Sequence, residues 1–115
     1  MRLAFAASST SVDDIGCVFE GASSDVTLMF EDGRSVRLWW HDGALGEDEC
    51  VLDVRIALTP SAVTIELELS TTSLYNGPYS GFDITYEDYD DRFGDLRMTF
   101  AKLLERRPDA LAVTE

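Results

Sequence analysis

The sequence predicts an α+β fold. The expected fold has a mainly antiparallel β-sheet of about six to seven strands, arranged in successive hairpins. One amphipathic C-terminal helix packs on this sheet. Two observations lead to this prediction. Successive segments alternate apolar and polar residues with the period of strands that bury one face, and the last quarter of the chain has the three-and-four spacing of a helix. The alternative is a β-sandwich with a helical cap.

A chain of 115 residues has room for one ordinary core, so residues 1–115 are expected to form a single domain with the sheet over 2–87. The strands are expected at residues 2–7, 15–20, 25–41 (a hairpin), 50–58, 62–70 and 82–87. Polar connections are expected at residues 8–14, 41–49, 59–61 and 70–81. The strands on either side of residues 59–61 should form a second hairpin, because so short a connection joins neighbours.

The hairpin over residues 25–41 is the clearest in the chain. Its apolar residues alternate with polar ones on both sides of an Asp-Gly turn. A three-residue loop with Gly33 in the left-handed conformation pairs Leu28 with Val36 and places both apolar sets on one face. Trp39 then points to the opposite face. There it is either covered by a second layer or exposed as an anchor for a partner, because tryptophan is enriched at binding hot spots.

The C-terminal helix is expected over about residues 91–107. Its apolar residues fall on one stripe, formed by Phe93, Leu96, Phe100, Leu103 and Leu104. Asp90 or Asp91 can cap its first turn, and Pro108 is a stop signal. Residues 109–115 are expected to be frayed or to form a short extension.

Cysteine content and charge limit the environment of the protein. Cys17 and Cys50 share the strand parity of inward-facing neighbours, so free thiols in a reducing cytoplasm are favoured over a disulfide. No apolar run approaches the roughly 20 residues that span a membrane. The net charge is −13, with 22 acidic against 9 basic residues. Such a charge repels nucleic acid and membrane phosphates and favours a basic partner, although solubility alone is the simpler interpretation.

The motifs of an enzyme are missing from the sequence. His41 is the single histidine, and the adjacent Asp42 points to the other side of the strand. The chain has no Gly-x-Ser-x-Gly elbow, phosphate loop or dinucleotide fingerprint, and the acidic run 86–91 lacks the ligands of an EF-hand. We therefore predict no catalytic residue, no cofactor and no metal. An irregular divalent-metal site is the open alternative, and it would draw on Asp42, Asp48, Asp88 or Asp90.

Three segments carry the residue types of a binding surface. The connection over residues 70–81 is rich in Tyr, Ser, Gly and Asn, the composition of antibody paratopes. The other two segments are acidic. The predicted partner-binding residues are Asp42, Glu47, Asp48, Glu49, Tyr75, Tyr79, Glu87, Asp88, Tyr89, Asp90 and Asp91. This prediction assumes that the three segments converge on one surface.

Size, charge and architecture together predict a small cytoplasmic inhibitor that is not an enzyme. Its acidic, tyrosine-bearing surface would bind a basic protein, a nuclease or a nucleic-acid-binding complex, by presenting carboxylates where that partner expects phosphates. Immunity proteins against nuclease toxins and phage-encoded anti-CRISPR inhibitors are proteins of this kind. The alternatives are a small-molecule- or divalent-metal-binding module, and a structural subunit that forms a homodimer through Trp39 and a sheet edge.

Overall fold

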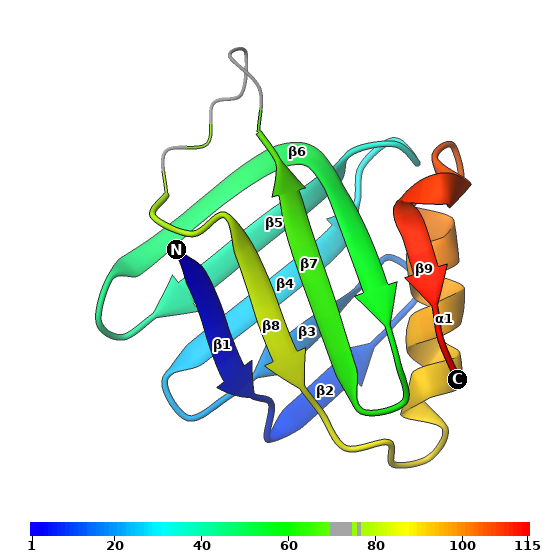
Figure 1. Cartoon of the computed structure of the whole chain (residues 1–115), viewed down its shortest axis with the longest axis horizontal. Helices are drawn as coiled ribbons and strands as arrows, with labels where there is room; N and C mark the ends of the chain where they lie inside the picture. The colour runs from blue at the N-terminus through cyan, green and yellow to red at the C-terminus, as the bar shows by residue number, and fades with distance from the viewer. Residues whose placement is uncertain (70–74, 76) are drawn as a thin grey trace.

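The computed structural model describes residues 1–69, 75 and 77–115. Within these residues, nine strands form one mixed sheet, accompanied by a single α-helix (Figure 1). The strands are β1 (Arg2–Ala6), β2 (Ser9–Val12), β3 (Gly16–Glu20), β4 (Ser24–Phe30), β5 (Val36–Asp42), β6 (Gly46–Leu58), β7 (Ala62–Glu68), β8 (Gly81–Thr85) and β9 (Leu111–Val113). The helix α1 spans Arg92–Leu103, and a 3-10 helix, η1, spans Pro108–Ala110.

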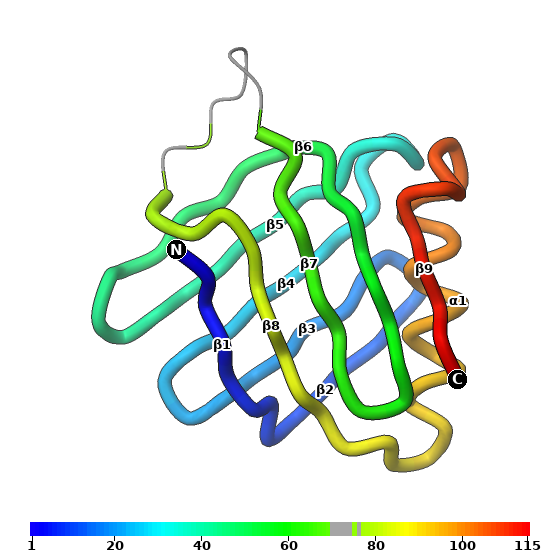
Figure 2. Tube along the Cα trace, in the orientation of Figure 1, coloured from blue at the N-terminus to red at the C-terminus, as the bar shows by residue number. Residues whose placement is uncertain are grey.

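The strand order is β1-β8-β7-β6-β5-β4-β3-β2, with β9 beside β6. Neighbouring strands are antiparallel except in the β1–β8 and β6–β9 pairs, which are parallel. The long strand β6 pairs with β5 along its first half and with β7 along its second half. Because β6 bends between these halves, the sheet folds over itself, and β3, β4 and β5 pass behind β7 and β8 (Figure 2).

The core lies between the two layers of the folded sheet. Its largest fully buried side chains include Phe19, Trp40, Ile56, Ile65 and Phe82, which come from both layers. The helix α1 buries Leu96, Phe100 and Leu103, and it packs against β2, β3, β4 and β9. It therefore closes one side of the space between the layers. Each such apolar side chain contributes about 1.5–3 kcal/mol when fully buried.

The predicted fold class is wrong in its central statement. The structure is 51% strand and 14% helical, with nine strands in one mixed sheet and a short helix. It is not a sheet of about six to seven strands with a helix packed on its face. A sandwich with a helical cap does not describe it either, because β6 runs through both layers and joins them into one sheet.

Two strands account for part of this difference. The polar connection predicted at 8–14 contains β2, which pairs with β3. The tail predicted to be frayed or a short extension contains β9, which pairs with β6. Neither strand has an alternating apolar pattern of useful length. Tertiary pairing makes them strands, because β propensity depends strongly on context.

The register of the β4–β5 hairpin also differs from the prediction. Phe30 lies opposite Val36 and Leu28 lies opposite Leu38, so the loop between the strands is longer than the three residues predicted. Asp32 explains the longer loop. Its carboxylate accepts hydrogen bonds from the backbone N–H groups of Arg34 at 2.9 Å and Ser35 at 2.8 Å. Gly33 has the predicted left-handed conformation, with φ of 87°. Since the register moved by two residues, both apolar sets still share one face.

The helix begins as predicted and ends earlier. Asp91 is its N-cap and accepts a hydrogen bond from the Gly94 N–H at 3.3 Å, while Asp88 accepts one from the Phe93 N–H at 2.7 Å. Both carboxylates therefore satisfy N–H groups of the first turn, which have no partner within the helix. No helix in the described part of the chain is long and apolar enough to cross a membrane.

Both cysteines are free thiols, as predicted. Cys17 is buried, and burial raises the pKa of its thiol far above the usual range. Cys50 is partly buried, and burial, together with the charges of Asp48 and Glu49, raises its pKa to about 11. Both groups are therefore protonated and unreactive at neutral pH, because the thiolate is the reactive form.

Candidate protein-binding face

The outward side of strands β2 to β6 presents the most distinctive surface of the protein. The strand registers align its residues in rows that run across the sheet. One row contains Ser9, Glu20, Asp25, His41 and Glu47, and the next contains Ser11, Val18, Thr27, Trp39 and Glu49. A third row contains Gly16, Met29, Arg37 and Val51. We call these three rows, with Glu31 at their border, the acidic face.

The carboxylates of the acidic face are only partly balanced by positive charge. Arg37, the one arginine in these rows, lies 3.3 Å from Glu31 and 3.3 Å from Glu49. The Nδ1 atom of His41 lies 3.7 Å from Asp25. The Glu20 side chain has no ion pair or hydrogen bond with any other described residue. The face therefore carries a net negative charge.

The outward side of the other layer is arranged differently. Its acidic residues alternate with arginines: Arg2 lies 2.7 Å from Glu66 and 2.8 Å from Asp83, and Arg55 lies 3.3 Å from Glu68. Pairs of this exposure contribute only about 0–1 kcal/mol to stability. Their effect on the charge pattern is larger, because two arginines against three carboxylates leave this side less negative than the acidic face, which has one arginine against five carboxylates.

Trp39 lies in the middle row of the acidic face and is partly exposed. Its ring stacks on His41, with centroids 6.1 Å apart and planes at 11°, and its Nε1 atom donates a hydrogen bond to Glu47 at 3.2 Å. Val51, on the neighbouring strand, is 43% exposed. An apolar centre with a charged rim is the usual anatomy of a protein–protein interface. Of the two alternatives for Trp39, the structure places its ring on the outer side of the sheet, partly exposed and packed against His41.

A groove of about 240 Å³ lies over β2, β3 and β4, and part of its lining belongs to the acidic face. Its outward-facing lining includes Val18 and Thr27, which belong to the row of Trp39, and Met29 from the next row. Thr27 lies directly opposite Trp39 in the β4–β5 pair. The groove therefore continues the apolar centre of the face toward β3.

The predicted loop at 41–49 is instead the end of a hairpin. Strand β5 continues to Asp42, and β6 already begins at Gly46. Glu47 and Glu49, two of the predicted partner-binding residues, point outward and belong to the acidic face. Asp48 lies opposite the buried Trp40 and is partly buried. Glu20 and Asp25, which the sequence analysis did not single out, join these two glutamates on the acidic face through the strand register.

Tyr75 and Tyr79 are not exposed contact residues, because their side chains are only 8% and 3% exposed. Tyr79 packs edge-on against Trp40, with ring centroids 4.9 Å apart, and its hydroxyl donates a hydrogen bond to the carboxylate of Asp42. This bond lowers the pKa of Asp42. Burial first, and then the same bond, raises the pKa of Tyr79 to about 12. The rest of that predicted loop, residues 70–74 and 76, lies outside the described residues.

The bond between Tyr79 and Asp42 predicts a pH-dependent effect of Tyr79→Phe. Because the folded protein holds the Asp42 pKa below its unfolded value of about 3.9, the bond contributes stability above that pH and loses it as pH falls through the folded pKa. The variant should therefore melt at a lower temperature than the wild type at pH 7, and the two curves should converge in acid. Thermal melts followed by circular dichroism from pH 7 to pH 2 measure this. A difference that persists unchanged at pH 2 would show that the hydroxyl acts without the carboxylate.

The acidic segment at 87–91 lies at the opposite end of the molecule from the β5–β6 turn (Figure 1). Asp88 and Asp91 are engaged with the first turn of α1, and Asp90 and Asp91 both have left-handed backbone conformations, with φ of 51° and 57°. The three predicted segments therefore do not converge on one surface. A metal site drawing on both Asp42 and Asp88 is also ruled out by this separation. Among the described residues, no group of three or more His, Cys, Asp or Glu side chains is placed to hold a metal ion.

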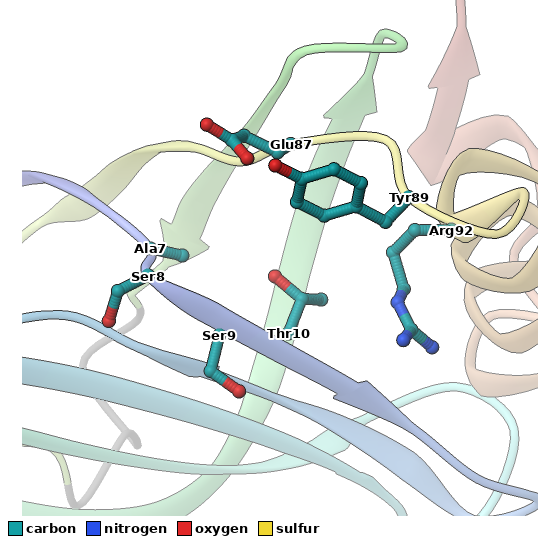
Figure 3. Close-up of a pocket in the computed structure, with 7 residues that line it drawn as sticks. All are labelled: Ala7, Ser8, Ser9, Thr10, Glu87, Tyr89 and Arg92. Carbon is teal, nitrogen blue, oxygen red and sulfur yellow. The ribbon is translucent and has the colours of Figure 1, made fainter.

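Tyr89 and Glu87 line a crevice of about 430 Å³ between β2 and the segment before α1 (Figure 3). The other lining residues are Ala7, Ser8, Ser9, Thr10 and Arg92. Figure 3 shows Thr10 pointing toward the Tyr89 ring, while Ser8 and Ser9 point away from the crevice. Arg92 lies 3.6 Å from Asp95, and the hydrogen bond of Tyr89 with Glu87 raises the Tyr89 pKa. His41 lies on β5, three strands away from β2, so no serine of the crevice is paired with a histidine base.

Comparison with protein-family models, with curated proteins and with solved structures gives no match. Fold and surface nevertheless define a class, a small acidic β-protein that presents a net negative, tryptophan-bearing face on its sheet. The function must therefore be argued from that face.

Proposed function

We propose that this chain is a small acidic inhibitor that binds a basic protein through the acidic face. The observation that carries the proposal is the partly exposed Trp39 among carboxylates that the chain itself leaves only partly neutralised. Proteins that bind nucleic acids use Lys and Arg to neutralise phosphates, so a row of carboxylates fits the same surface. We infer that the partner is a nuclease or another nucleic-acid-binding protein, as for immunity proteins and anti-CRISPR inhibitors, and that the cytoplasm is the compartment.

The two parts of the face have different roles in this proposal. The carboxylates attract the partner and align it, so they govern the association rate and its dependence on salt. Trp39 and its apolar neighbours lose water when the partner docks, so they govern how long the complex lasts. High salt should therefore slow association more than it speeds dissociation.

A charge-reversal experiment tests the acidic face. The variant Glu20→Lys/Glu47→Lys changes two exposed residues of the face. The matched control Asp109→Lys/Glu115→Lys changes the net charge equally at side chains that are 77% and 71% exposed and lie outside the face. Each protein is immobilised, lysate of the native host is passed over it, and bound proteins are eluted with a salt gradient and identified by mass spectrometry. Nuclease activity of each retained protein is then measured with and without the chain.

We expect basic proteins to be retained by the wild type and by the control, and to be lost from the Glu20→Lys/Glu47→Lys column. We also expect the free wild-type chain to inhibit the retained nuclease. Loss of an interfacial charge pair typically weakens binding by about 2 kcal/mol or more, close to thirtyfold. Equal retention on the two variant columns would contradict the role of the face, because then only net charge would matter. A retained partner whose activity is unaffected would contradict the inhibitory part of the proposal.

A further inference from the structure

We propose that the groove over β3 and β4 binds the stem of one arginine side chain of the partner, with its guanidinium held by Glu20 and Asp25 in the adjacent row. This inference rests on the proposed function, since it names the chemistry by which the acidic face recognises a basic protein. It concerns a defined position on the face. The neighbouring carboxylates on β6 are outside this site.

Glu20 and Asp25 form an unusual pair across β3 and β4, where they lie directly opposite each other. The Gly21 N–H donates a hydrogen bond to the Ser24 carbonyl oxygen at 2.8 Å, so the next pair along the strands, Glu20 with Asp25, is a non-hydrogen-bonded pair. Side chains are closest in pairs of this kind, and like charges placed directly opposite destabilise a sheet. His41 lies 3.7 Å from Asp25 on the β5 side, away from Glu20. A cation bound between Glu20 and Asp25 would remove the repulsion between these two carboxylates.

The groove supplies the other half of an arginine site. Val18 and Thr27 line it one row below the carboxylate pair, and Met29 lies one row further along. Adjacent rows are about 6.8 Å apart, because they are separated by two residues of a strand. An arginine whose aliphatic stem lies on Val18 and Thr27 would therefore bring its guanidinium to Glu20 and Asp25. Arginine side chains commonly cover apolar surface with the stem while the charged group stays in a polar environment.

The chemistry of the pair favours arginine over other occupants. Two adjacent carboxylates offer several acceptor oxygens, and the planar guanidinium donates to them in a bidentate manner that an ammonium group cannot reproduce. A metal ion is disfavoured, because no three potential ligands converge among the described residues. A second copy of the chain is disfavoured as well. It would bring another acidic face, and the arginine of that face, Arg37, is already paired with Glu31 and Glu49.

Nuclear magnetic resonance titration with small probes tests the site. The probes are N-acetyl-arginine amide, N-acetyl-lysine amide of the same charge, and neutral N-acetyl-citrulline amide. We expect the arginine probe to shift the Trp39 indole N–H resonance and the amides of Val18 and Thr27, and to bind at least about threefold more tightly than the lysine probe. The indole of Trp40, which is only 1% exposed, is the internal control and should not shift.

The variant Glu20→Gln/Asp25→Asn separates recognition from folding. It should weaken binding of the arginine probe about tenfold or more and keep or raise the melting temperature, because it removes the like-charge pair. The control Glu115→Gln, a neutralisation outside the face, should change neither. Equal affinity for arginine and lysine, or shifts confined to other residues, would overturn the arginine site. Retention of basic proteins on the column would in that case still support the proposed function, so the two failures are distinguishable.

Discussion

Replacing Trp40 with alanine is expected to lower the free energy of unfolding by about 3–5 kcal/mol, the usual loss for a large buried aromatic side chain. Trp40 is 1% exposed, lies between the two layers of the sheet, and packs against the edge of Tyr79. Because small domains are stable by only about 5–15 kcal/mol, this single change would bring the protein close to unfolding at ambient temperature. Urea unfolding followed by far-ultraviolet circular dichroism measures the loss without relying on tryptophan fluorescence.

The neighbouring residue provides the matched control. Trp39 is of the same type and one position away, and it points to the outer face, so Trp39→Ala should lower the free energy of unfolding by less than about 1.5 kcal/mol. The same variant should lose affinity for a basic partner. If both substitutions destabilised the protein equally, Trp39 would be part of the core and the acidic face would lack its anchor.

The opposite orientations of these two tryptophans could be predicted from the sequence, because strand side chains alternate. The same alternation predicted most strands, the shared apolar face of β4 and β5, and the buried stripe of α1, which the structure confirms through Leu96, Phe100 and Leu103. These features depend on residues within about ten positions of one another. Local periodicity is sufficient for them.

The remaining features depend on pairings between distant segments. Ser9–Val12 has no apolar pattern and becomes a strand because β3 offers it a partner. The start of β6, which is Gly-Glu-Asp-Glu, is poor in strand-forming residues and is extended because β5 lies beside it. The bend of β6 closes the layers on each other, and this closure buries Tyr79 against Trp40. None of these contacts leaves a signal in the local composition.

The residues of the candidate site likewise fall into those that local sequence indicates and those that only strand pairing brings together. Glu47 and Glu49 were predicted from the acidity of their segment, whereas Glu20 and Asp25 are isolated acidic residues in the sequence. Only the register of β3 with β4 places Glu20 against Asp25, and only the order of the strands places this pair in the row next to that of Trp39. A row that crosses a sheet is distributed over the chain, so a search for local charge runs finds segments such as residues 87–91 and does not find the row.

A second strongly destabilising substitution is Arg107→Ala, which lies outside the apolar core that contains Trp40. Its side chain is 11% exposed and lies 2.5 Å from Glu68 and 3.6 Å from Asp53, so it joins the segment after α1 to strands β7 and β6. Removing it leaves two carboxylates without their main cation. Breaking a fully buried pair costs about 3–5 kcal/mol. Asp53 and Glu68 are about a third exposed, so water screens part of their interaction with Arg107. We therefore expect Arg107→Ala to lower the free energy of unfolding by about 2–3 kcal/mol.

Arg34→Ala is the matched control, because Arg34 lies 4.0 Å from the same Asp53 but is 58% exposed. Its loss should change the free energy of unfolding by less than about 0.5 kcal/mol. The position of Arg107 also matters for the fold, since η1 and β9 follow it directly and β9 pairs with β6. Amide hydrogen exchange should therefore show faster exchange in β9 for Arg107→Ala and not for Arg34→Ala. Unchanged protection of β9 would mean that the parallel pairing with β6 alone holds the C-terminal strand in place.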